Sequence, residues 1–139
     1  MNGNLTVVQL TEALNNAMLG NGAILTAEVI EAELQVLQVL IQDREEFPVY
    51  VTIDDSQILC VSYLWREQEV VPKQRETLLE ALLSLNIPMP LSSFSKIGDQ
   101  YIIFGALSTR SDTDAVLQEI ATLSDNTLDA IELMADYLQ

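Results

Sequence analysis

The feature that most constrains the fold is a predicted β-hairpin in the second half of the chain. Its arms, residues 88–97 and 100–108, flank Gly98-Asp99, a pair that tolerates the positive φ values of tight turns. The second arm is almost continuously apolar over residues 101–107, as is typical of a strand covered on both faces. We therefore expect this strand to lie centrally in a sheet, with Gly105 marking a bulge or a close approach by a neighbour.

Two further strands are predicted before the hairpin, and they form a meander. Residues 47–53 alternate between apolar and polar with period two, turn residues 54–56 follow, and residues 57–65 continue as the partner strand. Pro48 has no backbone N–H to donate, so we expect it at the start of its strand or on a sheet edge.

Residues 26–42 fit two interpretations. A helix would place four apolar residues on one face: Ile30, Leu34, Leu37 and Ile41. The valine-rich part suits a strand instead. We favour a strand from about Glu33, because the two predicted strands that follow need a neighbour.

Three helices are predicted from apolar spacing. Residues 5–19 form the first, which Gly20-Asn21-Gly22 ends, and the leucines of residues 73–85 are expected to pack on the sheet. Residues 111–139 form the third, with Ser111 and Asp114 fitting a capping box.

Two details of these helices stay open. Residues 124–126 either interrupt the third helix or recap it. Lys73 and Arg75 lie in the first turn of the second helix, where the dipole disfavours positive charge, so either function or nearby carboxylates explain them.

These elements predict one α+β domain over residues 1–139. The expected order is α-β-β-β-α-β-β-α, with an antiparallel sheet of about five strands and helices packed on it. A chain of 139 residues needs no second domain to bury a core.

The charge of the chain limits its partners. Six Lys and Arg face 21 Asp and Glu, giving a formal net charge of −15 and a pI near 4.1. This field repels phosphate backbones and anionic lipid, so we expect no direct nucleic-acid binding. It favours basic partners. The alternative is that the acidity only keeps the protein soluble.

Two features are candidates for binding a partner. No Lys or Arg occurs from Ser111 to the end of the chain, and four carboxylates there share a helical face: Asp125, Asp129, Glu132 and Asp136. Either a basic partner offsets their repulsion or the face is only solvated. Trp65, the sole tryptophan, is either an exposed binding anchor or a core residue with its indole N–H satisfied.

Several kinds of catalytic chemistry lack their residues. The chain has no histidine, which removes the usual general base, and Cys60 is its single cysteine, expected to be buried and inert. Asp112-x-Asp114 fails as a calcium loop because apolar residues stand where ligands are needed, and Asp54-Asp55 fits a turn. We expect no enzyme, no catalytic or metal-binding residue and no cofactor.

The chain resembles the YjfI-like family of small bacterial proteins from about Glu33 onward. The segments that carry the resemblance are Phe47-Pro48-Val49-Tyr50-Val51, Gln57-Ile58-Leu59-Cys60, Ser62-Tyr63-Leu64-Trp65, Pro90-Leu91-Ser92-Ser93-Phe94, Phe104-Gly105-Ala106-Leu107-Ser108, Glu119-Ile120, Leu123, Asp125-Asn126 and Tyr137-Leu138. The resemblance implies no known enzymatic activity. It also implies a genomic association with membrane-stress proteins similar to phage-shock protein A, which are helical and partly basic.

The predicted element order is also similar to that of type III secretion chaperones and of YbjN-like proteins. Those chaperones are small, acidic and dimeric, and they bind partner segments along their sheet and helices. The similarity concerns topology, which by itself does not fix function.

We therefore expect a cytoplasmic interaction module, a homodimer, that binds a basic protein through its acidic C-terminal helix without inserting into a membrane. The chain has no apolar run of about 18 residues, and residues 1–4 lack the basic start of a signal peptide. An alternative is a small-molecule site between the sheet and the 73–85 helix. A third hypothesis is an acidic mimic of nucleic acid.

Overall fold

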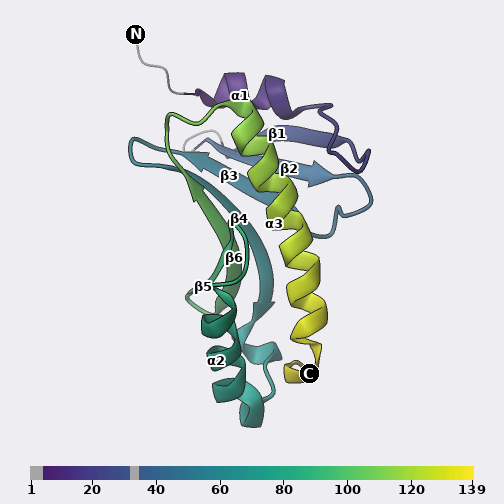
Figure 1. Cartoon of the computed structure of the whole chain (residues 1–139), viewed down its shortest axis with the longest axis vertical. Coiled ribbons are helices and arrows are strands. Elements are labelled where there is room, and N and C mark those ends of the chain that lie inside the picture. The colour runs from purple at the N-terminus through teal and green to yellow at the C-terminus, as the bar shows by residue number, and fades with distance from the viewer. Residues whose placement is uncertain (1–4, 32–34) are drawn as a thin grey trace.

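The computed structural model describes residues 5–31 and 35–139, which form six strands and three α-helices (Figure 1). The strands are β1 Leu25–Glu31, β2 Val36–Ile41, β3 Val49–Ile53, β4 Ile58–Arg66, β5 Ser93–Ile97 and β6 Gln100–Leu107. The helices are α1 Val7–Leu14, α2 Arg75–Leu85 and α3 Thr113–Leu133. Three short 3-10 turns are η1 Glu67–Glu69, η2 Pro72–Gln74 and η3 Ala135–Tyr137.

All six strands belong to one antiparallel sheet in the order β1-β2-β3-β4-β6-β5. The predicted α+β class and the meander into β4 are confirmed. Strand β6 pairs with β4 on one side and β5 on the other, so the expected interior position of the hairpin's second arm is also confirmed.

The sheet has one strand more than predicted, because residues 26–42 contribute two strands. In β1, Leu25 and Ala27 are buried whereas Thr26 and Glu28 are exposed, which is the alternation of an edge strand with one wet face. The helical spacing of apolar residues across 26–42 spans two strands by coincidence. The predicted start at Glu33 lies outside the described residues, and β2 begins at Val36.

The predicted hairpin forms around Gly98-Asp99, but its first arm is shorter than predicted, because β5 begins at Ser93 and not at Pro88. Ile97 pairs with Gln100, and Gly98 has φ +58°, which an L side chain adopts only with strain. Gly105 marks a close approach and not a bulge, because its pairing with Cys60 is in register. A Cβ at Gly105 would lie 2.5 Å from Glu119 Oε1 of α3.

The helix ends differ from the predictions by a few residues. Helix α1 stops at Leu14, not at residue 19, and a bridge between Met18 and Ile24 follows it. The N-cap of α3 is Asp112, one residue after the predicted Ser111, and its carboxylate accepts from the backbone N–H of Ala115 at 2.8 Å.

Helix α3 also continues through residues 124–126 without interruption. Polar side chains in a helix can compete with its backbone for hydrogen bonds. The side chains of Ser124 and Asn126 instead form hydrogen bonds with residues outside the helix. The Ser124 hydroxyl accepts from Arg44 Nη1 at 3.0 Å, and Asn126 Nδ2 donates to the Pro90 carbonyl at 2.9 Å.

The described helices all pack on one face of the sheet, and Figure 1 shows α3 crossing in front of the sheet with α1 above β1. Beneath α1 and α3 lies the larger core cluster, built on residues such as Val39, Val51 and Ile103. Beneath α2 lies a smaller cluster around Trp65 and Tyr101. The predicted packing of α2 through its leucines is confirmed, since Leu78 and Leu82 belong to this cluster.

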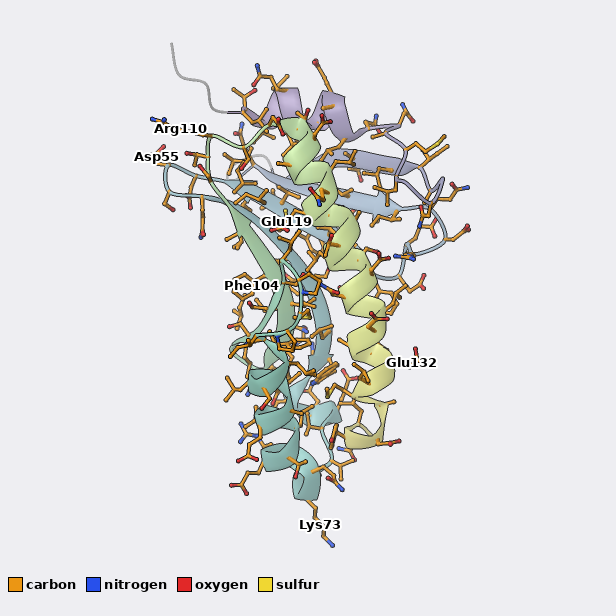
Figure 2. All side chains as sticks on the ribbon, viewed as in Figure 1. Asp55, Lys73, Phe104, Arg110, Glu119 and Glu132 are labelled. Atoms are coloured by element: carbon orange, nitrogen blue, oxygen red, sulfur yellow. The ribbon has the colours of Figure 1, made fainter. Side chains whose placement is uncertain are left out.

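The opposite face of the sheet carries no helix among the described residues. We call it the open face, made by the outward side chains of β2, β3, β4, β6 and β5. Figure 2 shows the contrast: Glu119 lies between α3 and the sheet, whereas Phe104 lies on the side of β6 away from α3.

Candidate partner-binding surface

The four carboxylates singled out in the C-terminal region are all exposed: Asp125, Asp129, Glu132 and Asp136. Figure 2 shows Glu132 pointing away from the body of the molecule. The first three lie on α3, but the helix ends at Leu133 and Asp136 belongs to η3. The expectation of one helical face is therefore correct for three of them and wrong for Asp136.

Asp125 already has an ionic partner within the chain. Its Oδ1 lies 2.7 Å from Arg44 Nη1, which ties the loop between β2 and β3 to α3. Within the part of the chain that the structure describes, Asp129, Glu132 and Asp136 form no salt bridge. These three carboxylates are therefore exposed and without an ionic partner in the described part of the chain.

An apolar cleft of about 250 Å³ opens beside this acidic stretch, between the end of α2 and the second half of α3. Its walls include Leu85, Met89 and Phe94 on one side and Ala130 and Leu133 on the other. Asp129 lines the same cleft, so carboxylate and apolar surface are continuous there. Leu133 is 61% exposed at its edge.

A strained turn fixes one wall of this cleft. Leu91 has φ +64°, a conformation costly for a branched side chain, and the Ser92 N–H donates to the Pro90 carbonyl at 2.8 Å. Asn126 of α3 holds this turn, because its Nδ2 donates to both the Pro90 carbonyl and Ser92 Oγ, the latter at 3.0 Å. No local sequence signal paired Asn126 with this turn, since the residues are 36 and 34 positions apart.

A second cavity, of about 300 Å³, lies where the sequence placed its alternative small-molecule site, between α2 and the β5–β6 hairpin. Leu79, Leu82, Phe94 and Tyr101 give it apolar walls, and Lys96 supplies a cation. Phe94 contributes to both cavities and separates them.

The Lys96 ammonium is held by a polar cluster that sequence reasoning missed. Glu67 accepts from Lys96 Nζ at 2.6 Å, from Arg75 Nε at 3.1 Å and from the Tyr101 hydroxyl at 3.1 Å. The hydrogen bond from Lys96, more than those from Arg75 and Tyr101, holds the pKa of Glu67 below its usual value. A neighbouring carboxylate therefore explains Arg75 in the first turn of α2.

Trp65 is a core residue, so its interpretation as an exposed anchor is wrong. Its side chain is 2% exposed, and its ring lies 5.8 Å from that of Tyr101 at an interplanar angle of 34°. The expected hydrogen bond is absent as well, since Trp65 Nε1 has no partner among the described residues. Trp65 therefore does not reach the surface that would meet a partner.

Two further ionisable groups are buried against the sheet. Glu119 is 4% exposed, and this burial raises the pKa of its carboxyl. Burial, with a smaller contribution from Glu119, raises the pKa of Cys60 to about 12. The thiol is thus protonated and enclosed at neutral pH, as expected for an inert cysteine.

Among residues 5–31 and 35–139, no three His, Cys, Asp or Glu side chains are grouped so that they could hold a metal ion. Within the same residues, no helix combines the length and apolar character needed to cross a membrane. The surface beside α3 combines the apolar lining of the cleft with the negative charge of Asp129.

Comparison with solved structures shows the fold. The E. coli protein YbjN superimposes with a TM-score of 0.69 and 14% identity, covering 95% of this chain and 92% of YbjN. The Yersinia pestis type III secretion chaperone SycH, in complex with a stable fragment of YscM2, gives 0.54 and 16%, covering 74% and 86%. The predicted topological similarity to both groups is confirmed.

Comparison of sequences shows the family. "Uncharacterized protein YjfI" from E. coli strains K12 and O157:H7 is 45% identical over 53 residues, which span 35% of this chain and 40% of the relative. A family model described as "Uncharacterized protein conserved in bacteria (DUF2170)" matches residues 4–138. With nearly its whole length matched, the chain belongs to the DUF2170 family.

Proposed function

We propose that this chain is a non-enzymatic, cytoplasmic protein-binding module, chaperone-like or regulatory, that captures a basic partner beside α3. The observation that carries the proposal is the position of Asp129 in the wall of the apolar cleft. A partner segment with apolar side chains next to Lys or Arg would fill the cleft and meet the carboxylates of Asp129, Glu132 and Asp136 together.

The electrostatics of α3 support a basic partner. Asp129 and Glu132 lie in its last turns, where the helix dipole disfavours negative charge by about 0.3–1 kcal/mol each. No basic residue stands in the last turn of the helix to offset them. A cation supplied by another protein would relieve both the dipole and the repulsion within the chain, whose net charge is −15.

The structural relatives support protein binding in general. SycH was solved with a protein fragment bound, so a chain of this fold can hold a segment of another protein. The resemblance to YjfI-like proteins makes a basic, helical membrane-stress protein similar to phage-shock protein A the first candidate to test.

The test is affinity capture of the tagged protein at low salt, followed by stepwise salt elution and direct titration of any partner found. Asp129→Asn, Glu132→Gln and Asp136→Asn together should weaken binding about tenfold, because three surface ion pairs contribute about 0.2–1 kcal/mol each. Leu133→Gln, at a side chain that is 61% exposed, should weaken binding without unfolding the chain.

A matched control removes three negative charges elsewhere. Glu12→Gln, Asp55→Asn and Asp114→Asn are exposed and lie outside the cleft, so they change the net charge equally and should leave affinity almost unchanged. Equal losses of affinity for both triple variants would mean that the interaction depends on net charge alone. Unchanged affinity after the substitutions at Asp129, Glu132 and Asp136 would exclude the acidic surface from binding.

A second candidate function is small-molecule binding in the cavity between α2 and the β5–β6 hairpin. The observation that favours it is the pairing of apolar walls with Lys96 and the Tyr101 ring in about 300 Å³, enough for a small organic anion. A thermal shift with metabolites, lost in Leu83→Glu at an exposed residue of the cavity wall, would support it. Absence of both a shift and a copurifying ligand would count against it.

A further inference from the structure

We propose that the open face of the sheet binds a second copy of this chain, face to face, in a two-fold symmetric pair. This interface lies on the side of the sheet away from α3 and its cleft, so it goes beyond the proposed function.

The open face carries apolar and aromatic side chains, whereas the solvent-facing side of a sheet in a monomer is normally polar. The register places Tyr50 beside Val61, Val61 beside Phe104, and Tyr63 beside Ile102, in one band across β3, β4 and β6. The rings of Tyr50 and Tyr63 lie 5.2 Å apart, and Tyr63 is 51% exposed although β4 is an interior strand. An antiparallel sheet with one wet face normally carries polar residues on that side.

The face is also hollowed, with a depression of about 450 Å³ over β3 and β4. Its outer margins are apolar as well, since Ile30 is 47% exposed near one end and Ile97 is 61% exposed near the other. Aromatic and aliphatic side chains around a concave centre are the composition of an interface core.

The charge distribution identifies a second copy as the occupant. No Asp, Glu, Lys or Arg lines this depression, although the chain holds 27 such residues, 21 acidic and 6 basic. A basic partner is drawn to the acidic helix and gains nothing from an uncharged face. Two copies of charge −15 repel wherever carboxylates meet, so the uncharged depression is the part of the surface on which they can join.

The dimensions are sufficient for such a pair. The five strands that make the open face, at about 4.8 Å spacing and each roughly 20 Å long, give a face of about 500 Å². Two such faces bury about 1,000 Å² together, the area at which specific interfaces begin. We therefore infer a weak dimer, whose population depends on the protein concentration.

Sedimentation equilibrium of the whole chain tests the proposal. At about 100 µM the wild type should approach twice the chain mass of 15.4 kDa. Tyr63→Glu should raise the dissociation constant at least about tenfold, because it buries two like charges in an uncharged interface. Tyr63→Phe, which keeps the ring, should still pair, and circular dichroism checks that each variant is folded.

Leu83→Glu is the matched control, since Leu83 is 71% exposed but lies on α2, on the helix side of the sheet. It should pair as the wild type does. Should Tyr63→Glu fail to fold, Ile97→Glu on the exposed edge strand takes its place. A wild type that stays monomeric at this concentration, or a Tyr63→Glu variant that pairs normally, would overturn the proposal.

Salt dependence separates this interface from capture of a basic partner. Screening reduces repulsion between two copies of charge −15, so the pair should tighten when NaCl rises from 50 to 500 mM, whereas binding of a basic partner should weaken. A pair that dissociates as salt rises would overturn the neutral-face interface. Loss of partner capture with the pair intact would refute the proposed function alone.

Discussion

The two faces of the sheet have similar side chains and very different surroundings. On the covered face, Val51 and Cys60 are at most 1% exposed beneath the helices. On the open face, the neighbours that alternate with them, Tyr50 and Val61, are only half-buried. The helices account for the burial of the apolar side chains on the covered face, and the pairing that we propose would account for those on the open face.

Substituting one isoleucine on each face should give the largest difference in stability between the two faces. Ile103 on the covered face is fully buried and Ile97 on the open face is 61% exposed. Ile103→Ala should reduce the free energy of unfolding by about 2–5 kcal/mol, because it leaves a cavity under α3. Ile97→Ala should change it by less than about 0.5 kcal/mol in the monomer.

Urea unfolding at a concentration where the chain is monomeric checks this pair. Equal losses for Ile103→Ala and Ile97→Ala would mean that the open face is as well packed as the covered one, and the contrast between the faces would disappear.

A methyl group at Gly105 tests how closely α3 approaches the covered face. The Cβ of Gly105→Ala would lie 2.5 Å from Glu119 Oε1 and 3.1 Å from the Leu91 carbonyl, so the variant should lose about 1–3 kcal/mol. Thermal unfolding measures the loss. Ala106→Gly, next along the strand but exposed, is the comparison and should cost less than about 1 kcal/mol. A Gly105→Ala variant as stable as the wild type would show that α3 can move away from β6.

Glu119 should destabilise the covered face at neutral pH. Its raised pKa means that the folded state keeps this proton above the usual value of 4.5, so stability falls as pH rises through and above that value. Glu119→Gln, which carries no charge, should therefore be more stable than the wild type at pH 7 by about 1 kcal/mol. Denaturant unfolding from pH 4 to 8 should show this advantage shrinking toward pH 4, and a constant or reversed difference would contradict it.

Glu67 should affect stability in the opposite direction to Glu119, and its substitution should have the smallest effect of the four. Its lowered pKa means that its contribution is present above its usual value of 4.5 and is lost as pH falls through its pKa in the folded state. Glu67→Gln should reduce stability at pH 7 by less than about 1 kcal/mol, because the ion pairs are partly exposed, and by nothing once Glu67 is protonated. The same unfolding series measures it, and a loss that persists at low pH would point to packing as the cause.

Much of the fold could be predicted from local patterns. The hairpin followed from Gly98-Asp99 before an almost continuously apolar second arm, and the packing face of α2 followed from the helical spacing of its leucines. Strand β1 was missed because an edge strand has a wet face and few distinguishing residues, whereas the apolar spacing over 26–42 also fits a helix. The extra strand was not predicted because the local pattern of residues 26–42 fits both a helix and a strand.

The candidate surface was predictable only in part. Acidic spacing on a helix indicated exposed carboxylates, and Asp129 and Glu132 are exposed as expected. The cleft beside them was not predictable, because it depends on Asn126 holding a turn 34 to 36 residues away. The Arg44–Asp125 ion pair joins residues 81 apart for the same reason, since only the folded chain brings them together.

The open face itself is tested most directly by hydroxyl-radical footprinting of the wild type at about 1 µM and about 100 µM. We expect Tyr50, Tyr63 and Phe104 to become protected at the higher concentration, while exposed Leu83 and Leu133 on the helix side keep the same reactivity. Unchanged reactivity of the three open-face aromatic side chains, or protection at the helices instead, would contradict it.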